Sequence, residues 1–102
     1  MIELIEHNRE ALREACVCYQ VRRLELFGSA ARGAFDPQHS DLDFLVEFGP
    51  LRPGQYADAY FGLLEALEAL FGRSVDLVMV RAIRNPSFLA AVNREREVLY
   101  AA

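Results

Sequence analysis

Two apolar runs between Leu26 and Val46, joined by a short polar segment, constrain this chain more than any other feature. The first run ends in Gly28-Ser29, and the second begins with Asp41 and Asp43. Side chains at positions i and i+2 of a β-strand point to one face, about 6.5 Å apart, so both carboxylates can face the same cation. A Gly-Ser turn that opens a helix offers backbone N–H groups and a hydroxyl to phosphate oxygens. Carboxylates for a metal beside a phosphate site are what phosphoryl and nucleotidyl transfer require.

Each half of this pattern is common by itself, because Gly-Ser is an ordinary turn pair and Asp-Leu-Asp is most often a turn or strand-edge feature. In this order, between two strand-like runs, the combination is far more specific. The segment resembles the signature of the DNA polymerase β-like nucleotidyltransferase superfamily. It is most similar to the minimal nucleotidyltransferase (MNT) branch, in which Gly-Ser-x-Ala-Arg-Gly precedes Ser-Asp-x-Asp. Eleven residues separate Ser29 from Asp41, where the family pattern has about ten, and the extra residue falls in a turn-rich loop at residues 35–39, where insertions are tolerated. Whether this longer loop impairs catalysis is left open by the sequence.

The composition indicates one globular domain spanning residues 1–102, with 53% hydrophobic and 25% charged residues. A net charge of −4 argues against broad, nonspecific or stable nucleic-acid binding, which depends on a positive surface. No apolar stretch approaches the ~20 residues that span a bilayer, and the first residues are acidic rather than signal-like. We therefore expect a cytoplasmic protein that does not associate with membranes.

The chain contains no lysine, since all eleven basic residues are arginine. This excludes a lysyl-AMP intermediate and a P-loop lysine. Any AMP transfer by this chain is therefore expected to be direct, from ATP to an acceptor.

Hydrophobic periodicity predicts alternating helices and strands, and hence an α/β layer fold. The resemblance implies an α+β arrangement, a small mixed β-sheet flanked by helices. Apolar residues at helical spacing predict helices, and apolar, β-branched runs predict strands. Gly72 is expected to end the helix at residues 56–71. The predicted helices are residues 4–19, 30–32, 56–71 and a last one opened by Asn85-Pro86-Ser87; the predicted strands are 21–27, 42–48 and 75–80, and Val98-Leu99-Tyr100 closes the chain.

A third carboxylate, Asp76, interrupts the last predicted strand. Burying a carboxylate in an apolar strand is costly without a partner, and a solvent-exposed strand end is the simple alternative explanation. The superfamily places a third acid on the strand next to its Asp-x-Asp pair, and Asp76 matches that position. The resemblance implies that Asp41 and Asp43 ligate two Mg²⁺ ions and that Asp76 completes the catalytic and metal site near the acceptor.

The resemblance also implies that Gly28 and Ser29 bind the phosphates of ATP, the substrate. Arg32 lies one helical turn beyond Ser29 and could add positive charge to that site, although a solvated helix residue is an equal interpretation. His39 is a weaker candidate, because loop histidines are usually solvated. A hydrolase built on Ser29 is excluded by the missing Gly-x-Ser-x-Gly elbow, since Ala31 stands where its second glycine belongs.

Minimal nucleotidyltransferases of this family are typically paired with HEPN-domain proteins in toxin–antitoxin modules. The resemblance implies an antitoxin that transfers AMP from ATP to a tyrosine of a HEPN toxin. The alternative is an inactive binding module that neutralises its partner by docking alone. Transfer to a small molecule or a nucleic-acid end is a third hypothesis, weakened by the acidic charge and by the lack of an acceptor domain. The acceptor, the number of AMP units, the nucleotide preference and the oligomeric state stay open.

Three smaller features carry expectations about packing. Cys16 and Cys18 diverge by about 200° on a helix, so we expect buried or half-buried thiols rather than a disulfide or a shared metal. The charged clusters at residues 22–23 and 94–97 are expected to be solvated. Phe61 lies next to Tyr60 and must leave the core face of its helix, as a partner contact or as a lone exposed aromatic.

Overall fold

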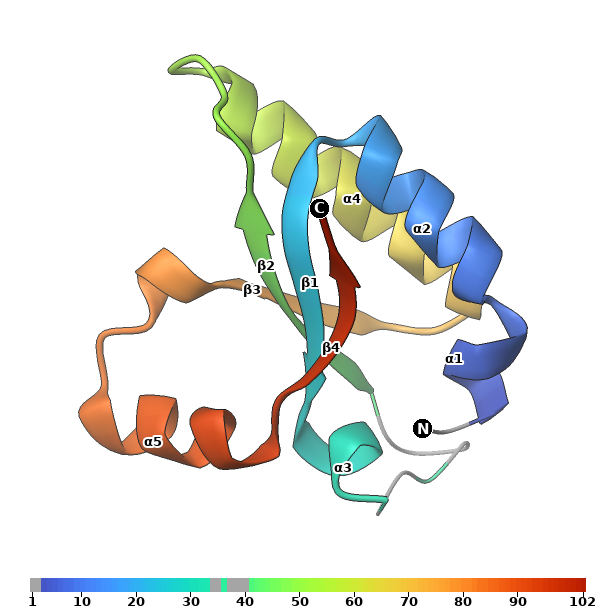
Figure 1. Cartoon of the computed structure of the whole chain (residues 1–102), viewed down its shortest axis with the longest axis vertical. Helices are drawn as coiled ribbons and strands as arrows, with labels where there is room; N and C mark the ends of the chain where they lie inside the picture. Colours follow the sequence, from blue (N-terminus) through green and yellow to red (C-terminus); the bar gives the residue numbers. More distant parts are fainter. Residues whose placement is uncertain (1–2, 34–35, 37–40) are drawn as a thin grey trace.

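The computed structural model describes residues 3–33, 36 and 41–102, and these form a four-stranded mixed sheet with helices on both faces (Figure 1). The predictions about His39 and the longer loop fall on residues outside this part of the chain. The helices are α1 (Glu3–His7), α2 (Arg9–Cys18), α3 (Gly28–Ala31), α4 (Gln55–Phe71) and α5 (Pro86–Glu95), with a 3₁₀ turn η1 (Val80–Ala82). The strands are β1 (Val21–Phe27), β2 (Leu42–Phe48), β3 (Val75–Met79) and β4 (Glu97–Ala101).

The strand order is β3-β2-β1-β4. Strand β1 pairs antiparallel with both β2 and β4, whereas β2 and β3 run parallel to each other. A parallel pair needs a crossover connection, and α4 supplies it. This arrangement confirms the expected mixed sheet flanked by helices.

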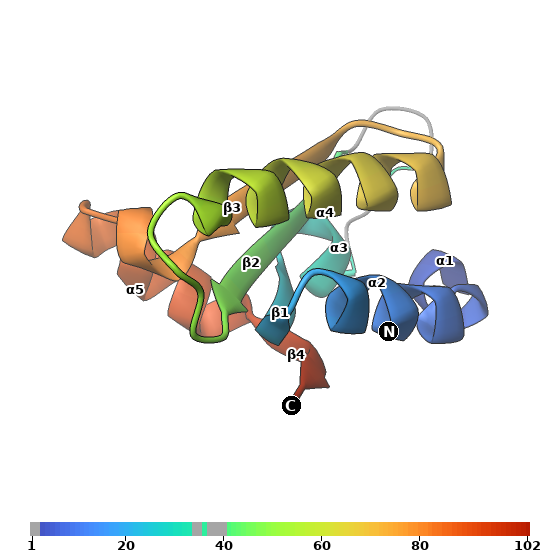
Figure 2. The same ribbon diagram turned by 90° about the horizontal axis from the view of Figure 1, so that it is seen from above.

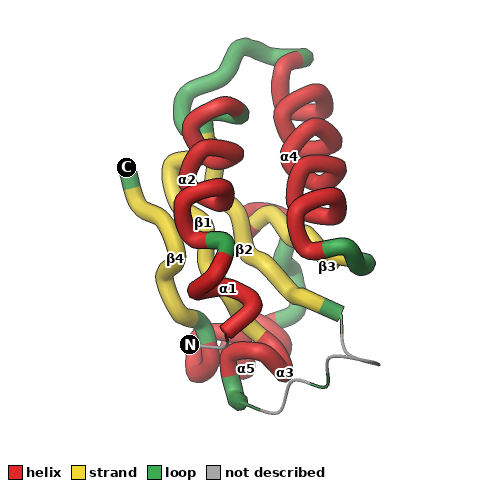
Figure 3. The backbone as a smooth tube through the Cα atoms, turned by 90° about the vertical axis from the view of Figure 1, so that its right-hand side faces the viewer, coloured by secondary structure: helices red, strands yellow, loops and turns green. Residues whose placement is uncertain are grey.

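Helices α2 and α4 lie side by side over one face of the sheet, and α5 lies on the opposite side (Figures 2 and 3). Alternation along β2 explains this division, because successive side chains of a strand point to opposite faces. Phe44, Val46 and Phe48 join the large core beneath α2 and α4. Leu45 points the other way and packs in a smaller cluster with Val92 of α5.

Two predicted elements differ from the observed ones. The first helix is interrupted at Asn8, whose side-chain amide donates to the Leu4 carbonyl at 2.8 Å and whose backbone N–H donates to Ile5. This side-chain competition for the backbone ends α1 and lets α2 begin again at Arg9. The closing Val-Leu-Tyr segment is a full edge strand, β4, whose pairing with β1 no local pattern specified.

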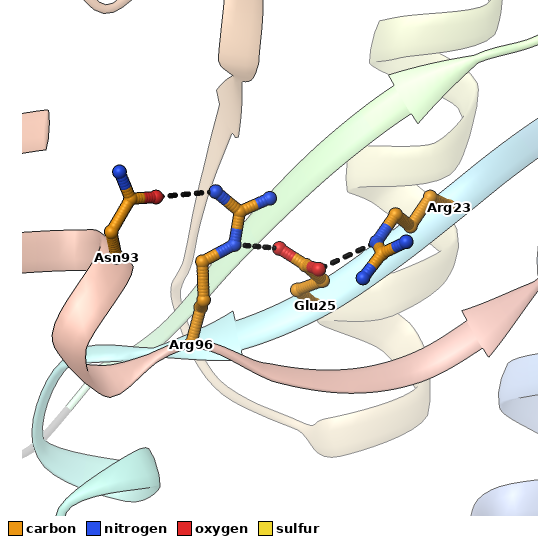
Figure 4. Close-up of polar contacts among 4 residues, drawn as sticks. All are labelled: Arg23, Glu25, Asn93 and Arg96. Atoms are coloured by element: carbon orange, nitrogen blue, oxygen red, sulfur yellow. Dashed lines mark hydrogen bonds and ion pairs between the residues drawn. The ribbon is translucent and has the colours of Figure 1, made fainter.

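A buried carboxylate, Glu25, lies on β1 between two arginines (Figure 4). Its side chain is 2% exposed, and it accepts from Nε of Arg23 at 2.6 Å and from Nε of Arg96 at 2.5 Å. Arg96 also donates to the side chain of Asn93 in α5. Arg23 is exposed, as expected, and also pairs with Glu25. The expectation of a solvated cluster is wrong for Arg96, which is only partly exposed, helps to neutralise the buried charge and joins β1 to the α5–β4 junction.

Both cysteines are free thiols; Cys16 is buried, as expected, whereas Cys18 is exposed and the expectation of at least partial burial is wrong for it. Burial raises the pKa of the Cys16 thiol to about 12, because a low-dielectric surrounding disfavours the thiolate. Among the described residues, none of the helices combines the length and the apolar character needed to cross a membrane.

Candidate active site

The turn from β1 into α3 brings a backbone segment and a carboxylate into direct contact. Gly28 adopts φ +72°, a left-handed conformation that glycine accepts without steric cost, and this redirects the chain into α3. A Cβ atom at Gly28 would lie 2.2 Å from Oδ2 of Asp43. Position 28 therefore requires glycine twice, once for its backbone angle and once because the Asp43 carboxylate occupies the space of a side chain.

The strand register aligns two of the predicted aspartates. Asp43 on β2 is the direct partner of Asp76 on the parallel strand β3, and of Phe27 on β1. Directly paired residues of neighbouring strands place their side chains on the same face of a sheet. Asp41 precedes β2 at position i−2 from Asp43 and is exposed.

The ionisation of Asp43 responds both to its burial and to the charges of the other two aspartates. The pKa of Asp43 is raised to about 6, first by burial and then by the charges of Asp76 and Asp41. Arg32 acts in the opposite direction and lowers this pKa, while Glu95 raises it. Like-charged carboxylates at close range disfavour their common ionisation, and a bound cation relieves that repulsion.

Arg32 lies at the end of α3, beside the Gly28-Ser29 turn. Its guanidinium donates from Nη1 to Oε1 of Glu95, in α5, at 2.8 Å, with the Arg32 side chain 51% exposed. The structure thus brings together Gly28, Ser29 and Arg32 on one side of Asp43. Glu95 is a member of the site that sequence reasoning missed, since no local spacing links it to Arg32 across 63 positions.

Tyr60 of α4 approaches the site from the outer side of β3. Its hydroxyl donates to the carbonyl oxygen of Leu77, the residue after Asp76. The pKa of Tyr60 is raised, first by burial and then by the charge of Asp76. Asp76, which is exposed, is therefore paired with Asp43 on one side and acts electrostatically on the Tyr60 side chain.

Within residues 3–33, 36 and 41–102, no three carboxylate, imidazole or thiol groups stand close enough together to enclose a metal ion by themselves. The donor set nonetheless suits Mg²⁺, which takes one or two carboxylates and completes its shell with substrate phosphates and water. Asp43, with the charges of Asp41 and Asp76 acting on it, provides such a set next to the Gly28-Ser29 turn.

Comparisons with known proteins agree with this geometry. The model of the family described as "Nucleotidyltransferase domain" matches residues 8–99. The chain is 37% identical over 97 residues to protein adenylyltransferase MntA of Thermococcus cleftensis, covering 95% of this chain and 87% of the relative.

Solved structures show the same fold. A structure assigned as a minimal nucleotidyltransferase superposes with a TM-score of 0.75 at 35% identity, covering 94% of this chain and 95% of that one. A second is the complex of a tri-AMPylated HEPN toxin of Shewanella oneidensis with its MNT antitoxin; the match has a TM-score of 0.64 at 18% identity and covers 95% of this chain and 72% of that one. With the family model spanning nearly its whole length, this chain belongs to the nucleotidyltransferase domain family, as a minimal nucleotidyltransferase.

Proposed function

We propose that this chain transfers AMP from ATP to a hydroxyl, that of a tyrosine, on a partner HEPN-domain toxin, and so acts as its antitoxin. The observation that carries the proposal is the contact between Asp43 and Gly28, because a carboxylate that is in register with Asp76 lies directly against the turn expected to hold the phosphates.

The residues divide the reaction between them. Gly28 and Ser29 would hold the triphosphate through backbone N–H groups and the hydroxyl, with the charge of Arg32 close by. The acceptor oxygen forms a bond to the α-phosphorus as the bond to the pyrophosphate oxygen breaks. Attacking and leaving oxygens lie roughly in line in such a transfer. Asp76, on the strand farther from α3, would accept the hydroxyl proton, a role that its register with Asp43 supports.

Asp41, Asp43 and Asp76 would hold two Mg²⁺ ions, which neutralise the triphosphate and lower the pKa of the acceptor hydroxyl when bound. The raised pKa of Asp43 is compatible with this role, because burial and then the charges of Asp76 and Asp41 disfavour its ionised form, which a bound cation would stabilise. An ATP-dependent reaction on a toxin also fits a protein of the cytoplasm.

The relatives support the choice of acceptor. One is a protein adenylyltransferase, and one fold neighbour is bound to an AMPylated HEPN toxin. A protein acceptor also fits the net charge of −4, which does not favour a nucleic acid.

The test is the intact mass of the neighbouring gene's product after incubation with this protein, ATP and Mg²⁺. We expect a gain of one or more AMP units, with the modified tyrosine identified by peptide mapping. Asp43→Asn should abolish the gain while the complex still forms, and Asp58→Asn, an exposed acid on α4, should not. A stable complex without mass gain would refute AMP transfer and leave inhibition by docking. Equal transfer by Asp43→Asn would refute the assignment of the carboxylates.

A further inference from the structure

An apolar groove of about 400 Å³ follows the outer edge of β3. Strand β3 is the last in the sheet order, and α4 runs alongside it (Figure 2). The groove is lined chiefly by Tyr56, Tyr60 and Phe61 from α4 and by Leu77, Val78 and Met79 from β3. Phe61 is 59% exposed, so a large aromatic side chain stands at the groove without a partner in the described chain that buries it.

The groove adjoins the candidate site along β3. Leu77, its first strand residue, follows Asp76 directly, and a strand advances about 3.3 Å per residue. Across the sheet, the turn at Gly28 lies at the end of β1, Asp43 on β2, Asp76 on β3, and the groove beyond β3. A molecule at the Leu77 end of the groove would therefore lie one residue along β3 from Asp76, and beyond Asp76 from the Gly28 turn.

The order of the Gly28 turn, Asp43, Asp76 and the groove across the sheet indicates which of the two substrates the groove binds. In an in-line transfer the pyrophosphate leaves on one side of the α-phosphorus and the acceptor oxygen enters on the other. With the phosphates held at Gly28-Ser29, the leaving side is the β1 side. The acceptor then enters from the β3 side, where the groove is.

The charges at the two ends of the groove differ. Asp76 marks the reactive end, whereas Arg81 follows the far end, with its guanidinium carbon 6.0 Å from the ring centroid of the groove residue Tyr56. Three strand steps and two 3₁₀ steps separate Asp76 from Arg81 along the backbone, about 14 Å. An extended peptide covers that distance in about four residues.

We propose that this groove binds the acceptor protein itself, through an extended segment with apolar side chains next to the modified hydroxyl and an acidic residue about four positions away that pairs with Arg81. The inference rests on the proposed function and specifies its protein substrate. A second copy of this chain and the adenine ring of ATP are the two other occupants that the groove could take, and the experiment separates them.

The probe is a fluorescein-labelled peptide containing Tyr-Leu-Ile-Leu-Glu, compared with a version that ends in Lys, and the readout is fluorescence anisotropy without nucleotide. We expect the Glu peptide to bind the wild-type chain more tightly than the Lys peptide. Phe61→Ser should weaken binding about tenfold or more, because it removes the aromatic side chain offered to the ligand. Arg81→Glu should reverse the preference between the two peptides. Val17→Ser, which removes another exposed apolar side chain (60% exposed) on α2, is the matched control and should bind as the wild type does.

Equal affinities across the variants would overturn the proposal. The proposal would also be overturned if the only effect of Phe61→Ser were weaker ATP binding, because the groove would then hold the adenine ring. It would be overturned as well if the only effect were lost self-association in sedimentation, because the groove would then hold a second copy of the chain. Because anisotropy needs no catalysis, the result is independent of the proposed function. Peptide binding as expected, with no AMP transfer to any acceptor, would refute the transferase activity and retain the groove as a protein-binding surface.

Discussion

Replacing Gly28 by alanine tests whether the position of Asp43 controls the reaction. The new Cβ would lie 2.2 Å from Oδ2, 3.0 Å from Cγ and 3.3 Å from Cβ of Asp43, whereas ordinary contacts begin near 3.4 Å. The carboxylate must therefore move by about 1 Å, and it can do so by rotation at little cost in stability. Misplacing a reacting group by about 1 Å costs on the order of 10²-fold in rate. We expect Gly28→Ala to reduce AMP transfer by about that factor.

The backbone strain of this substitution needs its own control. Gly72, at the end of α4, also has a positive φ (+64°), but a Cβ there meets no atom within 4 Å in the described structure. Both alanine variants pay the left-handed penalty of about 1–2 kcal/mol, which for a domain of this size lowers Tm by roughly 4–16 °C. Thermal unfolding should therefore give similar losses for both variants, while only Gly28→Ala loses AMP transfer in the mass assay. Equal activity in the two variants would refute the argument that Asp43 needs the space at Gly28.

Three further predictions concern charges and thiols. Glu25→Ala removes a buried carboxylate and its two ion pairs with partly exposed arginines, and should cost about 1.5–3 kcal/mol in urea unfolding. Glu47→Ala, which breaks an exposed ion pair, should change stability by less than about 1 kcal/mol. The folded-state pKa of Asp43, about 6, exceeds its ordinary value of 3.8, so its ionised form opposes folding above pH 6. Asp43→Asn should accordingly raise Tm at pH 7.5 in the absence of metal and nucleotide, and this gain should vanish by pH 4; a gain that does not depend on pH would contradict the charge argument. Iodoacetamide at pH 8 should modify the exposed Cys18 and spare the buried Cys16, giving one adduct natively and two in urea by mass spectrometry; two adducts on the folded chain would refute the burial of Cys16.

Local sequence patterns were sufficient for the elements that carry the site. The strands at residues 21–27 and 42–48 were predicted with the observed bounds. Apolar side chains that recur every second residue indicate a strand with one face on the core, and the turn residues at its ends mark where it stops. The Gly28-Ser29 turn and the spacing of Asp41 and Asp43 are likewise local features. The assignment of these residues to ATP and Mg²⁺ stays a prediction, supported by the geometry.

Contacts between residues far apart in the chain could not be predicted from local sequence patterns. Glu25 looks like any polar residue of an alternating strand, and only the meeting of β1 with the α5–β4 junction gives it Arg96 as a partner. Glu95 likewise reaches Arg32 only because α5 packs beside α3.

By itself, the sequence determined β1, β2 and β3, the principal helices, the turn at Gly28 and the family, because each depends on side-chain periodicity or on residues close together in the chain. Tertiary structure alone decided that Asp76 is in register with Asp43, that Asp43 fills the space at Gly28, and that an apolar groove adjoins Asp76. The physical reason is that strand register and helix docking are fixed by the packing of the whole core, which brings together side chains from elements that no local pattern connects.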